Sequence, residues 1–135
     1  MALHLSSNDQ KQLLHWAADA GQNECCGVLR GRDRTVTAVE WAANVAADPS
    51  RNFEIDPAAL IAVHKDARTG GVPLLGYFHS HPNGLARPSA SDIAQAAPDG
   101  LIWLIIAGGV VTAWQPIAIG AHVTGFTPVP LIVEG

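Results

Sequence analysis

The sequence predicts a mixed α/β (α+β) fold, in which a single central, mostly antiparallel β-sheet is flanked by helices. Three observations lead to this expectation: helical spacing of apolar residues in two segments, short apolar runs between turn residues, and the lack of any repeat or linker. Helices interspersed with strands and hairpins are typical of such layered folds. At 135 residues, the chain fits one domain, 1–135, with room for a hydrophobic core.

The first third of the chain predicts a helix followed by a hairpin. The helix is expected to begin after Ser6, which with Asp9 matches a capping box, and to end at Gly21. Two short apolar runs, 25–30 and 35–41, are expected to pair as the strands of the hairpin.

The middle of the chain predicts a second helix and a strand. After a brief extended piece at 53–55, Asp56-Pro57 predicts the start of the helix, because aspartate caps helices and proline suits the first helical position. Gly70-Gly71 is expected to end it. The apolar run 72–78 that follows is expected to be a strand.

The last third predicts a short helix and several strands. The helix is expected at about 91–97, with Ser89 or Ala90 near its cap. The remaining apolar runs predict strands over 101–107, 110–114, 117–124 and 129–133. Pro128 and Pro130 confine the last of these to an edge of the sheet, because proline cannot donate a hydrogen bond to a neighbouring strand.

Composition and charge exclude several classes of function. An apolar fraction of 48% with 15% charged residues indicates a folded chain, and a net charge of −4 without a basic cluster argues against nucleic acid as a partner. No signal-peptide pattern precedes the first helix. The longest apolar stretch, 101–114, is too short to span a bilayer. The adjacent Cys25 and Cys26 make a poor disulfide, so a reducing, cytoplasmic location is expected.

The most informative segment is His79-Ser80-His81-Pro82, together with Asp92. Side chains two residues apart on a strand point to the same face, so His79 and His81 can converge on one point. Turn residues between Pro82 and Pro88 allow Asp92 to fold back as a third ligand. Two imidazoles and one carboxylate suit one catalytic zinc ion, whose fourth position holds water.

A hydrolytic zinc site also needs a general base and a hydrogen-bond donor for the oxyanion that develops on the substrate. Glu24, Glu40 and Glu54 are candidates for the base, and Glu24 is favoured because it stands at the start of an apolar strand. Ser89 is a sensible donor, since it lies three residues before Asp92 and can share the site.

Each of these signals has a plainer interpretation when it stands alone. The histidines of an isolated His-x-His pair are more often solvated, Glu24 would be an ordinary turn acid, and Ser89 with Asp92 matches a helix capping box. The capping box and the metal site are compatible, because a capped helix start holds Asp92 still. The three signals together, at this spacing, favour the metal site.

Taken together, the motifs resemble those of the JAMM (MPN-plus) metalloproteases. The pattern of that family is a glutamate in an early strand motif, then His-x-His-Pro, six residues and Ser-x-x-Asp. Residues 79–82 and 89–92 match it completely, and 24–31 looks like the glutamate motif, with Cys25 where small residues are more usual. Residues 44–57 also look like a connection found in the bacterial members, so the resemblance covers most of the chain.

The resemblance implies a JAMM/MPN-like fold, similar to the cytidine-deaminase architecture, and a role for each motif residue. His79, His81 and Asp92 would bind one zinc ion, Glu24 would be the general base that assists attack of the zinc-bound water, and Ser89 would be the oxyanion donor. Family members hydrolyse peptide or isopeptide bonds after the C-terminal glycine of ubiquitin or ubiquitin-like proteins. Short prokaryotic relatives resemble enzymes that trim sulfur-carrier proteins. The implied partner is therefore a ubiquitin-like or sulfur-carrier protein with a C-terminal Gly-Gly tail.

Two alternatives from other classes stay open. One is a non-catalytic MPN-type scaffold, although such relatives typically lack one or more ligands and none is missing here. The other is a small-molecule zinc amidohydrolase that uses the same constellation. Zinc deaminases fit less well, because their signature needs His-x-Glu and a later Cys-x-x-Cys.

Overall fold

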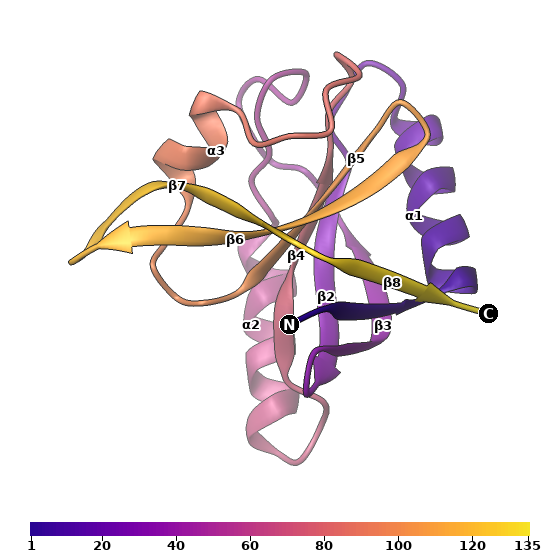
Figure 1. Ribbon diagram of the computed structural model, residues 1–135, viewed down its shortest axis with the longest axis vertical. Helices are drawn as coiled ribbons and strands as arrows, with labels where there is room; N and C mark the ends of the chain where they lie inside the picture. Colours follow the sequence, from indigo (N-terminus) through magenta and orange to yellow (C-terminus); the bar gives the residue numbers. More distant parts are fainter.

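The computed structural model describes residues 1–135 as eight strands and three helices. In chain order they are β1 (Leu3–Ser6), α1 (Ser7–Ala20), β2 (Cys26–Arg32), β3 (Thr35–Ala42), α2 (Pro57–Arg68), β4 (Leu74–Ser80), α3 (Ala90–Gln95), β5 (Ile102–Ala107), β6 (Val110–Ile119), β7 (His122–Val129) and β8 (Leu131–Glu134). All strands belong to one curled sheet, with α1 on one side and α2 on the other (Figure 1). None of the three helices is long and apolar enough to cross a membrane.

The sheet runs in the order β7-β6-β5-β4-β2-β3-β1-β8. Four neighbouring pairs are antiparallel (β2–β3, β2–β4, β5–β6 and β6–β7), and three are parallel (β1–β3, β1–β8 and β4–β5). The expected fold, one mostly antiparallel sheet flanked by helices, is therefore confirmed. The strand that carries His79, β4, lies at the centre of the sheet between β2 and β5.

Both long helices begin where the capping residues predict. The Asp9 N–H donates to the Ser6 side chain at 3.0 Å, and the Ala58 N–H donates to the Asp56 carboxylate at 3.1 Å. These bonds satisfy main-chain donors that have no partner inside the helix. Helix α1 ends at Gly21, whose φ of 61° lies in the left-handed region that glycine tolerates best.

The two faces of the sheet bury separate hydrophobic clusters, because successive side chains of a strand alternate between faces. On the face covered by α1, Phe78 stacks on Trp16 with ring centroids 5.6 Å apart, and Leu13 is fully buried beside them. On the opposite face, Tyr77 and Trp103 join the cluster that includes Val63 of α2. The strand alternation therefore turns His79 towards the second cluster, where its ring lies against Trp103.

One strand was not predicted, and two predicted runs, 117–124 and 129–133, each include parts of two strands. The chain begins with β1, which the sequence analysis missed because four residues give too short a pattern; its parallel partners β3 and β8 hold it in place. The predicted run 117–124 contains a turn at Gly120, whose φ is 61°. Residues before this turn extend β6 and those after it begin β7. The last strand, β8, lies at an edge as Pro130 predicts.

Candidate metal centre

The predicted ligands come from two neighbouring elements. His79 lies at the carboxyl end of β4, and His81 is the first residue after this strand. Asp92 lies in the first turn of α3. All three side chains are buried, with exposed fractions of 0%, 6% and 3%. Burial of two imidazoles and a carboxylate is costly unless they share a proton or a cation, so this cluster needs a chemical partner.

The ligand atoms of these residues converge on one point. The Nε2 atoms of His79 and His81 are 3.0 Å apart, and they lie 3.1 and 3.0 Å from the two carboxylate oxygens of Asp92. Two atoms bound at about 2.0–2.1 Å to one tetrahedral zinc ion are about 3.3–3.4 Å apart. The three side chains therefore have nearly the separations that a shared zinc ion requires.

A main-chain carbonyl fixes the orientation of the His81 ring. The Nδ1 atom of His81 lies 2.8 Å from the Leu85 carbonyl oxygen, which only accepts hydrogen bonds, so Nδ1 carries a proton. The lone pair of neutral His81 is then on Nε2, the atom that faces Asp92 and His79. Metal-binding histidines commonly donate their other ring N–H in this way.

Aromatic side chains hold the second imidazole. The His79 ring stacks on Phe53 with centroids 4.3 Å apart and an interplanar angle of 18°. It lies perpendicular to the Trp103 ring, with centroids 5.5 Å apart. Its Nδ1 atom is buried without a hydrogen-bond partner. In the sequence, Phe53 stands out only as part of a brief extended piece, and Trp103 only as part of the predicted strand 101–107. No local pattern marked them as neighbours of His79, because all three are distant in the chain.

Ser89 and Asp92 form the capping box that their spacing predicts. The Asp92 N–H donates to Ser89 Oγ at 3.0 Å, and the Ser89 N–H donates to Asp92 Oδ2 at 2.9 Å. The same Asp92 oxygen lies 3.0 Å from His81 Nε2. The Ser89 oxygen only accepts in this arrangement, so its own O–H is free to donate to another group.

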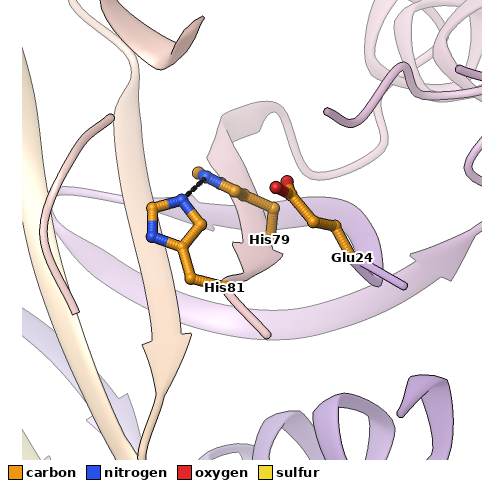
Figure 2. A group of neighbouring side chains, drawn as sticks. All are labelled: Glu24, His79 and His81. Atoms are coloured by element: carbon orange, nitrogen blue, oxygen red, sulfur yellow. Dashed lines mark hydrogen bonds between the residues drawn. The ribbon is translucent and has the colours of Figure 1, made fainter. Parts of the chain in front are cut away.

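Glu24 reaches the same place from the segment before β2. Its carboxylate offers an oxygen within 4.8 Å of ligand atoms of His79 and His81, and Figure 2 shows it pointing toward the two imidazoles. The side chain is 6% exposed, and Oε1 has no hydrogen-bond partner. Burial is the main reason that the pKa of Glu24 is raised to about 7. The charge of His81 lowers this pKa, and the negative charge of Asp92 raises it further. A carboxyl group with this pKa exchanges protons readily near neutral pH.

Hydrogen bonds to the main chain hold Glu24 in this position. Asn44 Nδ2 donates to the Glu24 carbonyl at 2.9 Å, and the Glu24 N–H donates to the Pro49 carbonyl at 2.8 Å. On the other side, the Cys25 N–H donates to Ser80 Oγ at 2.8 Å, which ties this segment to β4. Asn44 is a supporting residue that the sequence analysis did not identify.

The other two glutamates considered as bases lie away from the histidines. Glu40 forms an ion pair with Arg30 at 3.6 Å on β3, and Glu54 has an exposed side chain. Neither contacts His79 or His81, so Glu24 alone among the three faces the site.

Burial and hydrogen bonding together shift the pKa values of the three predicted ligands. Burial lowers the pKa of His79, and this effect outweighs the hydrogen bond to Asp92, so its imidazole is neutral. For His81, burial is outweighed by the Asp92 and Leu85 hydrogen bonds, which raise its pKa. For Asp92, burial is outweighed by the hydrogen bonds from both histidines, so its pKa falls and it stays ionised. Asp92 thus supplies one negative charge, and two imidazole nitrogens complete the donor set once His81 Nε2 has lost its proton, a set that suits a divalent cation.

A polar cavity of about 320 Å³ opens beside this cluster, and none of its lining residues is hydrophobic. They are Glu24, Ser50, Arg51, His81, Pro82, Asn83 and Ser89. The cavity therefore brings the predicted base, one predicted ligand and the predicted oxyanion donor to one water-accessible space. A second cavity of about 560 Å³, between α1 and β3, shares Glu24 with it.

The type and spacing of the ligand atoms in these residues suit a single zinc ion. Two nitrogen atoms and one carboxylate lie at nearly the required separations, one histidine has its tautomer fixed, and buried polar atoms of His79 and Glu24 lack partners. Histidine and aspartate are common zinc ligands, and three protein ligands leave one position for water.

Comparison with known proteins identifies relatives of the chain. Residues 6–117 match the family of prokaryotic homologues of the JAB domain. The chain is 39% identical to a desampylase of Haloferax volcanii over 84 residues, which are 61% of this chain and 60% of the relative. It is 40% identical to a probable TtuB-protein conjugate cleaving protease of Thermus thermophilus over 73 residues, 54% of this chain and 49% of that protein. The matched parts thus span less than two thirds of either relative.

Solved structures share the fold. A protein from Desulfitobacterium hafniense is 30% identical, with a TM-score of 0.81 over 98% of this chain and 92% of that one. A JAB1/MPN domain protein from Archaeoglobus fulgidus has a TM-score of 0.62 at 18% identity, with both chains fully covered. The expected JAMM/MPN-like fold is therefore confirmed.

Proposed function

Because the chain belongs to the prokaryotic JAB-domain family, we propose that it is a zinc-dependent metallopeptidase formed by one domain, residues 1–135. Its substrate is a ubiquitin-like or sulfur-carrier protein, and the bond hydrolysed is the peptide or isopeptide bond after the C-terminal glycine. The observation that carries this proposal is the convergence of His79, His81 and Asp92 at 3.0–3.1 Å beside the buried carboxylate of Glu24.

The substrate class rests on the relatives. The desampylase and the TtuB-conjugate cleaving protease bear names that describe cleavage of protein conjugates. The polar cavity that Glu24 and Ser89 both line suits a thin, flexible chain better than a folded surface, because its volume is about 320 Å³. A Gly-Gly terminus has no side chains and can enter such a space.

His79, His81 and Asp92 would hold the metal. When bound, zinc supplies a Lewis acid that polarises the scissile carbonyl and acidifies water. The Nδ1–H of His81 remains bonded to the Leu85 carbonyl and keeps the ring oriented. Phe53 and Trp103 exclude water from the face of His79, which strengthens electrostatic interactions within the site.

Glu24 and Ser89 would supply the two other catalytic roles, proton transfer and stabilisation of the oxyanion. Glu24 accepts a proton from the attacking water and delivers it to the leaving amine, a role that suits a carboxylate with a pKa of about 7 and no competing partner. The free O–H of Ser89 donates to the oxygen of the scissile carbonyl as negative charge develops there. Asp92 and Ser89 hold each other through the capping box, so helix α3 keeps both groups at the site.

We further propose a cytoplasmic location. Cys25 and Cys26 are both free thiols in the interior, as expected for a protein that folds in a reducing compartment.

The test combines metal analysis with one cleavage assay. Zinc-loaded protein is incubated with fusions of a small Gly-Gly-terminated carrier domain to an additional residue or to a lysine of a second protein, and the product masses are measured. We expect one equivalent of zinc and cleavage after the terminal glycine. A metal-free protein that binds the carrier without cutting it would instead indicate a scaffold. Cleavage of free acyl-dipeptides at the same efficiency as the carrier would indicate a small-molecule amidohydrolase.

A further inference from the structure

The polar cavity beside the candidate metal centre contains one strongly basic side chain, that of Arg51. The nearest carboxylate is Asp48, whose Oδ2 lies 3.9 Å from Arg51 Nε. This separation is well beyond the roughly 2.7–2.9 Å of a charge-assisted hydrogen bond. Arg51 has no other ion pair, and 83% of its side chain is exposed, so the guanidinium is available to a ligand.

The turn that carries Arg51 is attached to Glu24. The Arg51 N–H and the Asn52 N–H both donate to the Asp48 carbonyl, at 3.2 and 3.0 Å, and the Pro49 carbonyl accepts the Glu24 N–H at 2.8 Å. Asn44 Nδ2 bonds both the Glu24 and the Asn52 carbonyls, at 2.9 and 3.0 Å. The main chain of Arg51 is therefore held in a definite position relative to the main chain of Glu24.

This arrangement places a cation on the side of the leaving group. In hydrolysis the water oxygen bonds to the glycine carbonyl carbon, the C–N bond breaks, and Glu24 delivers the proton to the departing amine. The amine must therefore lie near Glu24, which lines both cavities. Only the smaller one is also lined by His81 and Ser89, so the atoms attached to the amine are assigned to that cavity, which Arg51 lines.

The chemistry of the leaving group decides whether Arg51 has a partner. A departing α-amino acid carries its carboxylate on the carbon next to the amine, where a neighbouring guanidinium can bind it with two parallel hydrogen bonds. A departing lysine side chain of a conjugate carries no charge near its amine-bearing carbon. The cavity volume of about 320 Å³ is also at the lower end of small-ligand pockets, about 300–1,000 Å³, and suits one amino acid.

We propose that Arg51 determines specificity by binding the free α-carboxylate of a single C-terminal amino acid that follows the glycine, an inference that rests on the proposed peptidase function. The chain thereby favours removal of one terminal residue over cleavage of lysine isopeptide conjugates. Arg51 acts on binding of the leaving group and takes no part in proton transfer.

Two probe peptides test this inference: acetyl-Gly-Gly-Ala with a free carboxylate, and the same peptide with a C-terminal carboxamide. Cleavage is measured with zinc-loaded wild type and with Arg51→Gln, Arg51→Lys and Arg87→Gln. Binding without turnover is measured on a Glu24→Gln background through amide chemical shifts. Arg87 is the matched control, because it is an exposed arginine of the loop before Ser89 and does not line the cavity.

We expect wild type and Arg87→Gln to prefer the free acid over the carboxamide by about tenfold or more, as for a hydrogen bond between charged groups. Arg51→Gln should lose this preference mainly through KM, because the carboxylate is bound before and during the reaction. Arg51→Lys should retain part of it, since it keeps the charge but not the paired geometry. Binding to the Glu24→Gln background should follow the same order.

Other outcomes overturn the inference. It fails if wild type treats the two peptides alike, if Arg51→Gln weakens both equally, or if neither peptide is bound. The carrier-fusion assay separates this failure from failure of the proposed function. If the lysine-linked fusion is cleaved faster than the fusion with one terminal residue, the role of Arg51 is wrong, but the peptidase activity stands. If the protein binds the free acid more tightly than the carboxamide but cleaves neither carrier nor peptide, the proposed peptidase function is wrong, but the carboxylate-binding role of Arg51 stands.

Discussion

Ser89 and Asp92 bind each other reciprocally at the start of α3: the Ser89 hydroxyl oxygen accepts the Asp92 N–H at 3.0 Å, and Asp92 Oδ2 accepts the Ser89 N–H at 2.9 Å. Asp92 Oδ2 also lies 3.0 Å from His81 Nε2. One carboxylate oxygen thus belongs both to a helix cap and to the candidate metal centre. The stability of a short helix and the geometry of the site are therefore coupled through Asp92.

Replacing Ser89 by alanine should lower both stability and activity. The lost cap costs about 1 kcal/mol, and the lost oxyanion donor should reduce kcat about 10²–10³-fold. Ser6→Ala is the matched control, because Ser6 Oγ accepts the Asp9 N–H at the same 3.0 Å at the start of α1. Thermal unfolding and carrier cleavage are measured for both. If Ser6→Ala lost activity as severely as Ser89→Ala, the role of Ser89 would be reduced to capping.

Glu24→Gln should separate metal binding from proton transfer. The amide keeps the shape of the side chain but cannot accept the proton, so hydrolysis should fall about 10²–10⁴-fold while one zinc ion stays bound. Removing a buried carboxylate that has no partner on Oε1 should not lower the melting temperature. Zinc content, melting temperature and kcat are the readouts. Full activity in this variant would show that another group moves the proton.

Asp92→Asn should weaken the metal site and leave the helix cap in place, since the asparagine side chain still accepts the Ser89 N–H. The substituted amide has no negative charge to balance a divalent cation. We expect a loss of bound zinc by elemental analysis and a loss of hydrolysis. A chelator should lower the melting temperature of zinc-loaded wild type, because the folded state binds the ion, but should barely change that of Asp92→Asn. Equal chelator sensitivity of the two proteins would contradict the assigned ligand set.

A substitution at Gly76 would test the close approach of β4 and β5. A Cβ atom at this position would lie 1.9 Å from the Ile102 carbonyl oxygen, and main-chain atoms cannot move away cheaply. Gly76→Ala should therefore destabilise the fold by about 1–3 kcal/mol in denaturant titrations. Gly125→Ala on β7 is the control, since nothing lies within 4 Å of a Cβ there. Similar losses in both variants would mean that the effect does not arise from the β4–β5 contact.

The two cysteines should be inert in the folded protein. Burial raises the pKa of Cys25, and it raises the pKa of Cys26 from 9.0 to about 12, which reduces the Cys26 thiolate population about a thousandfold below pH 9. Iodoacetamide at pH 8 should modify both thiols far more slowly in native than in unfolded protein. Because the folded state holds the Cys26 proton more tightly than the unfolded state, its contribution to stability is complete below about pH 9 and is lost as the pH rises toward 12. Native thiols that react as quickly as unfolded ones would show that this segment opens.

Local sequence signals predicted most of the secondary structure. Capping residues such as Ser6 and Asp56 act on main-chain groups a few positions away, so their effect is visible in the sequence. The same holds for Ser89 with Asp92. The four-residue β1 was missed because its stability comes from pairing with β3 and β8, which lie elsewhere in the chain.

The residue types and spacing alone determined the chemistry that this chain offers: two imidazoles two residues apart, an aspartate behind a capped helix start, and a glutamate before an apolar strand. Only the tertiary structure decided how they meet. Antiparallel pairing of β2 with β4 sets Cys26 opposite His79 and so brings Glu24 to the imidazoles. The tertiary structure also stacks Phe53 on His79 and brings Arg51 to the wall of the cavity. Spacing constrains neighbours along the chain, whereas burial, tautomer and access depend on side chains that folding brings from distant segments.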